Sequence, residues 1–497
     1  MMSPQLVEVP LVKCAVWDRL VLCPAARRSR AWSAVLLPAV IMLLAACESD
    51  SPARAGRPVG GRAPSILIVV LDACRADRLG CYGYDRPTSP AIDALAGDPD
   101  AVVYLDHHVQ GAFTKSSTAS LFTGLYVFQH GVIRGHDIKQ NPAGSGVLPV
   151  QVLPEQFHTM AEQFGEIGMW TFGVVKSYHL DPESGFAQGF DEYYPAKSLH
   201  GDWLRVRKTV DLIAAAPGPF FGYLHLEACH HPFPERYRHA EIMEAYGFEY
   251  DEEARKARGV DFTTAQIKHA INDEELALTS EGVRFLNLIY DAKLRFVDEH
   301  LVAPLIDSLK KVGRYDDTLV ILTADHGEEL YDHRGYAHGH ALWEEVIRVP
   351  LIVKFPKGRR PRRLAGDVEA TTQSVDLLPS LLAFLGRPAG EDLPGADIFD
   401  GAGRDFAYSQ TETQWTLIQD AYKLIDGGGT TLLFSRASDP GEQVNLAERE
   451  PDRVEAMRQA ATAMRQHVTT APREAPVHET ELDEEAIKAL RSLGYLR

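Results

Sequence analysis

The chain has 497 residues, of which 45% are hydrophobic and 24% are charged. This length can bury the core of one large α/β domain plus a smaller one, and the composition is that of an ordinary globular protein. The 51 basic and 69 acidic side chains give a net charge of −18, which argues against nucleic-acid binding and means that any anion site must be built from local groups.

Residues 1–47 are predicted to be an N-terminal extension followed by a signal peptide of the lipoprotein type. Arg27, Arg28 and Arg30 precede the apolar run Ala31–Ala46, which is shorter than the roughly 20 residues of a membrane-spanning helix. Leu44-Ala45-Ala46-Cys47 resembles the lipobox of bacterial lipoproteins, so we expect a lipid anchor on Cys47 and a location in the bacterial cell envelope, in the periplasm or at the cell surface. An ordinary cleaved signal peptide is the alternative. The first 26 residues fit no signal peptide, and a start codon assigned too far upstream would explain them.

Residues 48–62 are rich in Pro, Gly, Ala and Arg and are predicted to be a flexible linker. From residue 63 to about 390, short apolar runs alternate with helical stretches, which predicts an α/β domain with a mostly parallel sheet between helices. The strands that we expect are Ser65–Leu71, Phe220–Leu226, Thr318–Thr323 and Leu351–Phe355. Ligands of such sheets collect at the carboxyl ends of the strands.

Two segments do not follow this alternation of predicted strands and helices. Residues 235–285 are dense in charge and are predicted to be a solvated helical insertion that could act as a lid over the substrate. After a helix that includes Leu377–Leu382, residues 391–497 are predicted to form a smaller subdomain with an antiparallel sheet and a helix. The hairpin Ala421–Phe434 turns at three glycines, and Val454, Met457 and Ala461 recur at helical spacing. The mature chain keeps Cys74, Cys81 and Cys229, which allow at most one disulfide.

Four side chains at strand ends and in one loop form the candidate site. Asp72 follows the first strand, Asp325 and His326 follow the third, and Thr114 opens a loop that enters a helix. Two carboxylates, an imidazole and a hydroxyl can share one divalent cation, and that cation can make the hydroxyl a nucleophile. Alone, Asp-His-Gly is a common turn and threonine a common helix N-cap. Their occurrence together at strand ends favours the metal site.

The motifs around these residues resemble those of the sulfatase family of the alkaline phosphatase superfamily. The motifs are Leu71–Gly83, Thr114–Gly124 with Gln129-His130-Gly131, Gly185–Tyr193, His230-His231-Pro232-Phe233, Asp325–Glu329, His338-Gly339-His340 and Arg348-Val349-Pro350. Later matches are Asp439-Pro440-Gly441-Glu442 and the ending Leu493-Gly494-Tyr495-Leu496. The resemblance implies an alkaline-phosphatase-like fold and hydrolysis of an anionic ester.

Two departures from the family pattern qualify that expectation. Sulfatases carry Cys or Ser at the head of a Cys-x-Pro-Ser-Arg motif, and this residue matures to formylglycine, whereas here the five positions are Thr114 to Thr118. Threonine cannot give that aldehyde, so no formylglycine is expected, and a threonine nucleophile resembles the phosphodiesterase, phosphonate hydrolase and phospho-head-group transferase branches. Ala73 stands where the family often has a second aspartate. We therefore expect one divalent ion, which could be Mn, Zn or Ca.

The resemblance also assigns roles residue by residue. It implies Asp72, Thr114, Asp325 and His326 as metal ligands, Thr114, His230 and His338 as catalytic residues, and Lys115, Lys176, His230 and His338 as substrate-binding residues. His230 and His338 are expected to titrate near pH 7 and to supply the proton for the leaving group. His225, beside Glu227, is expected to be structural, His231 to neighbour the site, and His333 and His340 to form hydrogen bonds rather than to bind a second metal.

Three functions follow from these assignments. The first is a hydrolase, exported and metal-dependent, that cleaves phosphate, phosphonate or sulfate esters through a covalent Thr114 intermediate. The second is a transferase that moves a phospho-head-group onto surface glycans. The third is a binding protein without catalysis on the same fold. The expected partners are an anionic ester and, through Cys47, the membrane; no nucleic acid is expected and the sequence predicts no oligomeric state.

Overall fold

The computed structural model describes residues 63–133, 147–233, 240–247, 266–468, 477–481 and 488. The chain divides into two units, 1–53 and 54–497, and every described residue belongs to the second. The predicted signal peptide, Cys47 and the 48–62 linker lie outside the described residues, as do parts of the 235–285 segment and the ending Leu493–Leu496. Within the described ranges, no helix is long and apolar enough to span a membrane.

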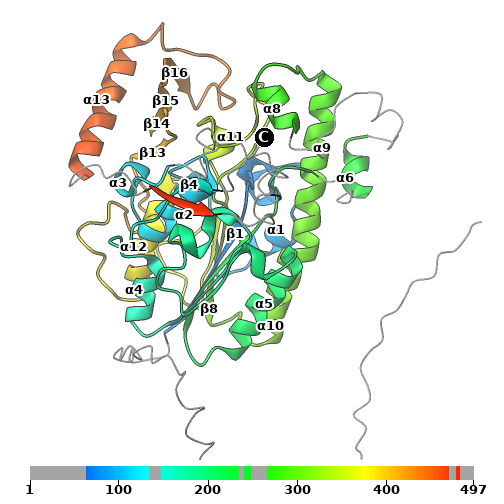
Figure 1. Cartoon of the computed structure of the whole chain (residues 1–497), viewed down its shortest axis with the longest axis vertical. Coiled ribbons are helices and arrows are strands. Elements are labelled where there is room, and N and C mark those ends of the chain that lie inside the picture. Colours follow the sequence, from blue (N-terminus) through cyan, green and yellow to red (C-terminus); the bar gives the residue numbers. More distant parts are fainter. Residues whose placement is uncertain are drawn as a thin grey trace, which may run out of the picture. The chain divides into compact units, whose positions relative to one another are not determined.

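A seven-stranded sheet forms the centre of the fold (Figure 1). Its strands, in spatial order, are β2 (Ala101–Tyr104), β11 (Leu351–Lys354), β8 (Thr318–Thr323), β1 (Ser65–Leu71), β7 (Phe220–Leu226), β5 (Trp170–Val174) and β6 (Glu192–Tyr194). β8, β1, β7, β5 and β6 run parallel, whereas β11 is antiparallel to both of its neighbours. The prediction of a mostly parallel sheet between helices is confirmed, and β1, β7 and β8 have the predicted bounds.

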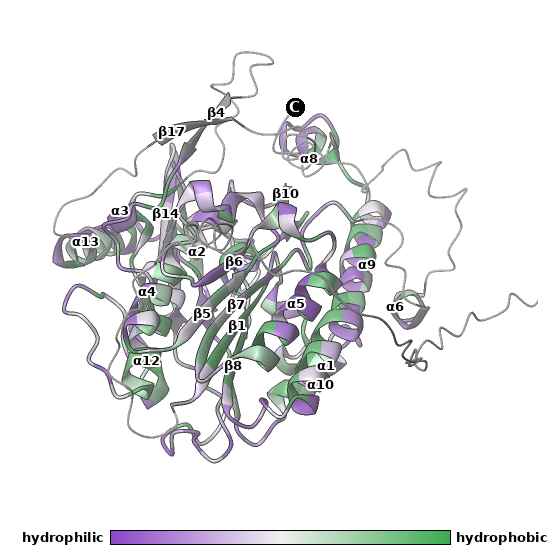
Figure 2. Cartoon of the chain, turned by 60° about the horizontal axis from the view of Figure 1, so that its bottom comes forward, coloured by the Kyte–Doolittle hydropathy of each residue, from purple (hydrophilic) through white to green (hydrophobic). Residues whose placement is uncertain are grey.

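Alternate residues of the central strands face two separate layers of helices. From β1, Leu67, Val69 and Leu71 pack into one buried cluster, and Ile66, Ile68 and Val70 pack into another. The first cluster contains residues of α1 (Pro90–Ala96), α5 (Asp202–Ala215), α9 (Ser280–Val297) and α10 (Ala303–Lys311). The second contains residues of α2 (Thr114–Thr123), α4 (Met160–Glu166) and α12 (Leu377–Phe384). Because both faces are covered, β1, β7 and β8 are mostly apolar, as the green of these strands in Figure 2 shows.

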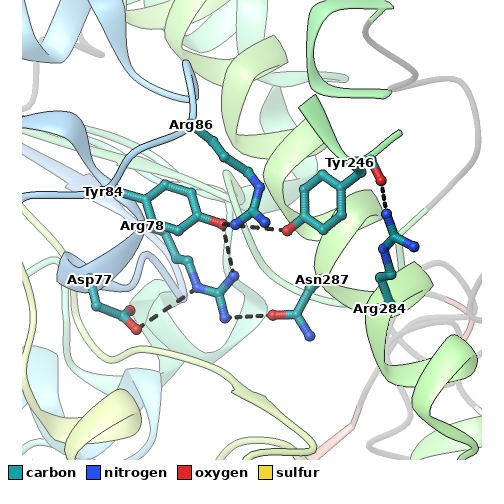
Figure 3. A pocket seen from close by; sticks show the side chains of 7 residues that line it. All are labelled: Asp77, Arg78, Tyr84, Arg86, Tyr246, Arg284 and Asn287. Atoms are coloured by element: carbon teal, nitrogen blue, oxygen red, sulfur yellow. Dashed lines mark hydrogen bonds and ion pairs between the residues drawn. The ribbon is translucent and has the colours of Figure 1, made fainter. Parts of the chain in front are cut away.

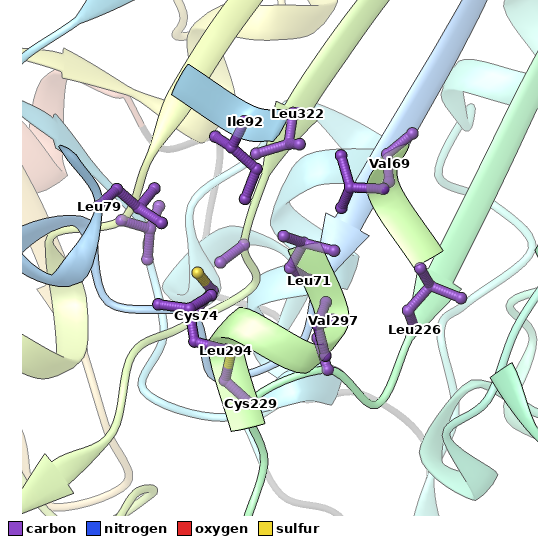
Figure 4. Close-up of a cluster of buried hydrophobic side chains, with 14 of the residues drawn as sticks. Val69, Leu71, Cys74, Leu79, Ile92, Leu226, Cys229, Leu294, Val297 and Leu322 are labelled. Carbon is purple, nitrogen blue, oxygen red and sulfur yellow. The ribbon is translucent and has the colours of Figure 1, made fainter. Parts of the chain in front are cut away.

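The carboxyl end of β1 is held by apolar packing immediately beside the polar site. Leu71 and Cys74 share a cluster with Cys229, which follows β7, and with Leu294 and Val297 of α9 (Figure 4). The backbone N–H of Cys229 donates to the carbonyl of Asp72 at 2.9 Å, which ties the two strand ends together. All three cysteines of the described chain are free thiols.

The C-terminal part forms a separate antiparallel sheet of four strands, as predicted. These are β13 (Phe406–Gln410), β14 (Gln414–Gln419), β15 (Tyr422–Gly427) and β16 (Thr430–Ser435), and α13 (Pro451–Val468) packs on them through Val454, Met457 and Ala461. Gly427, Gly428 and Gly429 all have positive φ, so the hairpin turns where the sequence places three glycines. The described part of the charged insertion is helical, with α6 (Ala240–Ala245), α8 (Gln266–Asn272) and the first turn of α9.

Short elements complete the fold around the carboxyl edge of the main sheet. They are the two-stranded pairs β9 (Glu329–Leu330) with β10 (Tyr336–Ala337), β3 (His107–His108) with β12 (Thr372–Gln373) and β4 (Val147–Gln151) with β17 (Val477–Glu481), and the helices α3 (Val127–His130) and α11 (Glu344–Ile347). The sequence did not predict these pairs, because strands of two to five residues carry too little periodicity to distinguish from loops.

Candidate active site

Two adjacent strands bring the predicted metal ligands Asp72, Asp325 and His326 together. Asp72 follows β1, and Asp325 and His326 follow its neighbour β8. One ligand atom of each residue lies within 4.8 Å of the others, and all three side chains are buried. His326 Nε2 is 3.5 Å from Asp72 Oδ1 and 3.7 Å from Asp325 Oδ2.

The hydrogen bonds of His326 orient it as a metal ligand. Its Nδ1 lies 2.8 Å from the carbonyl oxygen of Gly327 and donates to it. In the neutral ring, Nε2 then carries a lone pair, and that lone pair faces the carboxylates of Asp72 and Asp325. Asp72 Oδ1 is buried without a hydrogen-bond partner among the described residues. Three electron-rich atoms thus converge on one point, which is the arrangement that a divalent cation satisfies.

The pKa values of the two carboxylates shift in opposite directions. Burial, followed by repulsion from Asp325, raises the pKa of Asp72 well above its usual value. Burial alone would raise the pKa of Asp325 too, but attraction to His326 and His225 outweighs it and holds that pKa below its usual range. A cation between the two groups would favour the ionised form of both.

Thr114 is the first residue of α2 and lies against this cluster. Its Oγ1 is 3.2 Å from His326 Nε2, and its hydroxyl also forms a side-chain hydrogen bond with Asp325. The first backbone N–H groups of a helix have no intrahelical acceptor, and the helix dipole is positive at this end. An anion bound beside Thr114 therefore meets donors and partial positive charge. The predicted loop before the helix is shorter than expected, because the helix begins at Thr114 itself.

The backbone at Ala73 has a conformation that is rare for a residue other than glycine. Ala73 has φ of 60°, in the left-handed region, and its N–H donates to Asp325 Oδ1 at 3.4 Å. Ala337, just before His338, has φ of 73°. Such conformations cost about 1 kcal/mol or more in a non-glycine residue and are characteristic of functional sites. Ala73 thus contributes a backbone donor to the carboxylate of Asp325.

A group of three buried histidines lies next to the metal-ligand cluster. The rings of His230 and His338 are 4.7 Å apart, and the ring of His338 is 3.9 Å from that of His326. Glu328 lies behind them: its Oε1 is 2.7 Å from His338 Nδ1 and its Oε2 is 3.5 Å from His231 Nδ1. Lys293 donates to the carbonyl of His230. The carboxylate of Glu328 orients the His338 ring so that Nε2 is the atom turned from it.

The prediction that His230 and His338 titrate near pH 7 is not supported in the ligand-free protein. Burial, then the neighbouring His231 and His338, lowers the pKa of His230 well below its usual value. Burial and the neighbouring His326 do the same to His338. Sequence spacing could not reveal this, because the shift arises from how deeply the rings are packed. A bound dianionic ester beside the rings would favour their protonated forms.

The two predicted substrate lysines contact other groups. Lys115 is fully buried and its Nζ donates to Ser184 Oγ at 3.1 Å, and burial lowers its pKa to about 7. Lys176, beyond β5, forms an ion pair of 2.9 Å with Glu227, which follows β7. Both lie near the carboxyl edge of the sheet, but the structure gives each a protein partner.

A family model described as Sulfatase matches residues 64–387. This chain belongs to the sulfatase family. Among curated relatives, "Uncharacterized sulfatase YidJ" of Escherichia coli is 24% identical over 444 residues, covering 78% of this chain and 83% of the relative. "N-acetylglucosamine-6-O-sulfatase" of Bacteroides thetaiotaomicron is 22% identical and covers 74% of each chain. Among solved structures, the phosphonate monoester hydrolase of Agrobacterium radiobacter superposes with a TM-score of 0.63 at 19% identity, covering 82% of this chain and 96% of that one.

The sequence analysis did not assign three residues that lie beside the site: His225, Glu328 and Lys293. His225, expected to be structural, has its Nε2 3.5 Å from Asp325 Oδ2 and 3.8 Å from Asp72 Oδ2. Glu328 and Lys293 support the histidine group as described above. The Asp325–Glu329 motif contains Glu328, so its position two residues after His326 was the available signal. Nothing in the sequence around Lys293, in the middle of a helix, pointed to the site.

Proposed function

We propose that this sulfatase-family hydrolase cleaves phosphate, phosphonate or sulfate esters through a covalent intermediate on Thr114, in the presence of one divalent ion. The observation that carries the proposal is the contact of 3.2 Å between Thr114 Oγ1 and His326 Nε2, inside the buried cluster with Asp72 and Asp325. A hydroxyl in that position contacts the candidate ligands His326 and Asp325 directly.

Asp72, Asp325, His326 and Thr114 are the residues that would hold the ion. When bound, a divalent ion lowers the pKa of the hydroxyl and offsets the charge of the ester oxygens. The chain positions the hydroxyl at the N-terminus of α2, where backbone N–H groups face the anion. Burial of the whole cluster lowers the local dielectric constant and strengthens each of these interactions.

The proposed reaction has two displacements. In the first, the deprotonated Thr114 oxygen forms a bond to phosphorus or sulfur while the bond to the leaving-group oxygen breaks. In the second, water attacks the same centre, the bond to Thr114 breaks and the Thr114 oxygen is regenerated. The leaving oxygen requires one proton and the attacking water gives one up, so a single acid–base group can serve both steps.

His338 is the residue that we assign to this proton transfer. Its ring touches the ring of His326, which itself contacts Thr114, and its Nδ1 is fixed by Glu328. Glu328 also stabilises the protonated ring, as the carboxylate of a catalytic triad does. His230, 4.7 Å from His338, would bind the ester oxygens beside it.

We further propose that the protein acts outside the cytoplasm, anchored through Cys47. The support is the basic and apolar leader that ends at Leu44-Ala45-Ala46-Cys47.

The experiment that tests the proposal is an activity panel on residues 63–497 loaded with Mn²⁺, Zn²⁺ or Ca²⁺. Aryl sulfate, aryl phosphate, bis-aryl phosphate and aryl phosphonate esters would be compared, with Thr114→Ala as the control. We expect metal-dependent turnover of at least one ester class and recovery of a phosphorylated or sulfated Thr114 peptide after acid quench. Turnover that persists in Thr114→Ala would exclude the covalent mechanism, and bound metal without turnover of any ester would favour a transferase.

A further inference from the structure

His225 is a buried histidine near the end of an otherwise apolar strand, and the proposed reaction gives it no role. β7 reads Phe-Phe-Gly-Tyr-Leu-His-Leu, and the imidazole in it is fully buried. A polar ring in such a position costs free energy unless its nitrogens have partners. The groups that face this ring therefore indicate what it does.

The alternation of side chains along β7 directs His225 to the side of the sheet that α2 covers. Tyr223, two residues earlier, packs into the buried cluster that contains residues of α2. Val70 of β1 is in register with His225 and packs into the same cluster. Residues two apart on a strand share a face, so the imidazole points to the side on which α2 begins at Thr114.

Backbone hydrogen bonds fix His225 relative to Asp72. The N–H of Asp72 donates to the carbonyl of Leu226, and the carbonyl of Asp72 accepts from the N–H of Cys229, both at 2.9 Å. Leu226 directly follows His225. The imidazole and the carboxylate of Asp72 therefore belong to one hydrogen-bonded frame, and their contact does not depend on a free loop.

Nε2 of His225 faces both carboxylates of the candidate cation site. It lies 3.5 Å from Asp325 Oδ2, a long hydrogen bond, and 3.8 Å from Asp72 Oδ2. Within 4 Å, the basic side-chain nitrogens that face these carboxylates in the described chain are those of His225 and His326. His326 approaches Asp72 at the other oxygen, Oδ1, which has no hydrogen-bond partner among the described residues. The two rings thus reach Asp72 at different oxygens.

The second nitrogen of the His225 ring determines where its proton lies. Nδ1 is buried and has no hydrogen-bond partner in the described part of the chain. A proton on Nδ1 would be a buried donor without an acceptor, which is costly, whereas a proton on Nε2 faces a carboxylate. Nε2 therefore carries the proton and donates to Asp325 Oδ2. A nitrogen that donates a proton has no lone pair for a cation, so the ring supports the ligands rather than joining them.

Another buried carboxylate, Asp291, is held in a different way. Its Oδ2 accepts from the hydroxyls of Tyr84 and Tyr246, and Arg78 Nη1 lies 3.7 Å from its Oδ1. Figure 3 shows this arginine with Tyr84 and Asn287, to which it also donates. A side-chain cation thus accompanies Asp291. The ring beside Asp325, in contrast, donates one hydrogen bond and needs no charge of its own to do so.

We propose that His225 is a positioning residue of the cation site, which donates from Nε2 to Asp325 and holds the carboxylates of Asp325 and Asp72 in the arrangement that a divalent ion binds. The proposal rests on the proposed function for the presence of the ion. Two neighbouring carboxylates repel each other, so a donor that faces one oxygen of each keeps them close before the ion arrives. Metal-ligating carboxylates are commonly held by such hydrogen bonds, and loss of the partner lowers metal affinity by about 10- to 100-fold.

The first test compares two amides of different reach at this position. The side-chain nitrogen of Gln falls near the position of histidine Nε2, whereas the shorter Asn places its nitrogen near that of Nδ1, away from the carboxylates. The metal-free full chain, His225→Gln and His225→Asn would be titrated calorimetrically with Mn²⁺ and with Zn²⁺. We expect one ion per wild-type chain, an affinity within about threefold of wild type in His225→Gln and a loss of about tenfold or more in His225→Asn.

Folding and location are controlled separately. Urea denaturation shows whether each variant folds, and His225→Leu, which removes both nitrogens, provides a second loss variant. His107→Asn is the matched control, because His107 is also fully buried in a strand but bonds Thr372 and Ser374, and it should bind the ion as the wild type does. Wild-type affinity in the folded loss variants, or an equal loss in His225→Gln and His225→Asn, would overturn the proposal.

The second test separates a positioning residue from a metal ligand. With Co²⁺ bound, the visible absorption spectrum reports the atoms that bind the ion. His225→Gln should keep the wild-type spectrum, and a changed spectrum would mean that His225 binds the ion itself. Neither test uses an ester. A wild type that binds no ion would contradict this proposal and the proposed function together, whereas the expected binding without any hydrolysis would contradict the proposed function alone.

Discussion

Two clusters of carboxylates and histidines in this molecule have similar composition but opposite electrostatics. Asp72, Asp325 and His326 lie at the carboxyl edge of the main sheet, and Asp106, His108 and Glu344 lie where β3 meets the C-terminal sheet. In the second cluster, Glu344 is 3.3 Å from Lys423 Nζ and 3.4 Å from Arg436, and Arg436 also pairs with Asp106.

The pKa values of Glu344 and Asp72, one from each cluster, shift in opposite directions. Burial would raise the pKa of Glu344, but Lys423 and His108 outweigh it and hold that pKa well below its usual value. The pKa of Asp72 is raised instead, by burial and by Asp325. Side-chain cations therefore complete the Asp106 cluster, whereas Asp72 Oδ1 is buried without a hydrogen-bond partner among the described residues. A search for metal-type residues alone would not distinguish a structural network from a cation site.

The largest expected effect is at Thr114. Thr114→Ala should reduce turnover by about 10³-fold or more, because it removes the nucleophile and leaves only binding and electrostatic stabilisation. Thr114→Ser keeps a hydroxyl and should retain a measurable part of the rate. Steady-state kinetics on the best ester of the panel would measure both. Equal losses in the two variants would mean that the hydroxyl is not the reacting group.

Glu344→Gln should act on stability rather than on metal binding. Removing one carboxylate from this buried ion network costs about 1–3 kcal/mol, because Lys423 and Arg436 each lose one of two carboxylate partners and keep Glu442 and Asp106 respectively. Urea denaturation would measure the change in the free energy of unfolding, with the exposed Glu455→Gln on α13 as control. A Glu344→Gln protein of normal stability that no longer binds metal would reverse the two assignments.

Glu328→Gln should affect the pH dependence of catalysis. The amide cannot stabilise the protonated His338 ring, so kcat should fall by about 10- to 100-fold. Because the pKa of His338 falls further, the loss of activity with rising pH should move to lower pH. Glu329→Gln is the matched control, since Glu329 bonds His340 and not His338. A uniform loss of rate with no change in the pH profile would indicate a merely structural role for Glu328.

Buried histidines outside both clusters predict an acid-sensitive fold. His130 accepts from the Val132 N–H through Nδ1 and bonds Ser120 through Nε2, so its ring is neutral, and burial lowers its pKa to about 3. The unfolded chain binds more protons between about pH 3 and 6.5, so stability is present above pH 6.5 and is lost as the pH falls. The loss is about 1.4 kcal/mol per pH unit for one such residue.

His130→Gln should therefore flatten the dependence of unfolding free energy on pH between pH 7 and 5. Denaturant titrations at the two pH values measure the slope directly. If the variant and the wild type lose the same stability on acidification, His130 is not the group that takes up the proton.

The sequence predicted the parts of this molecule that depend on local pattern. β1, β7 and β8 are continuous apolar runs because both faces are buried, so their bounds followed from composition, and the ends of neighbouring parallel strands necessarily bring Asp72, Asp325 and His326 to one edge. The antiparallel direction of β11 did not follow, because a short apolar run carries no information on direction.

The direction in which a side chain points could not be predicted from the sequence either. Whether His225 faces the site depends on how β7 registers with β1, and whether Lys115 faces Ser184 depends on the packing of α2. The pairing of Lys176 with Glu227 requires two neighbouring strands to end at the same level. These contacts depend on the tertiary structure, and the residue types near a motif do not predict them.

We predict that the Asp72 cluster binds a cation and that the Asp106 cluster does not. Calorimetric titration of the metal-free protein with Mn²⁺ and Zn²⁺, alongside Asp72→Asn and Glu344→Gln, tests it most directly. We predict one ion per chain in the wild type and in Glu344→Gln, with affinity reduced about 100-fold or more in Asp72→Asn. No bound ion in the wild type, or an affinity that Asp72→Asn leaves unchanged, would contradict the account.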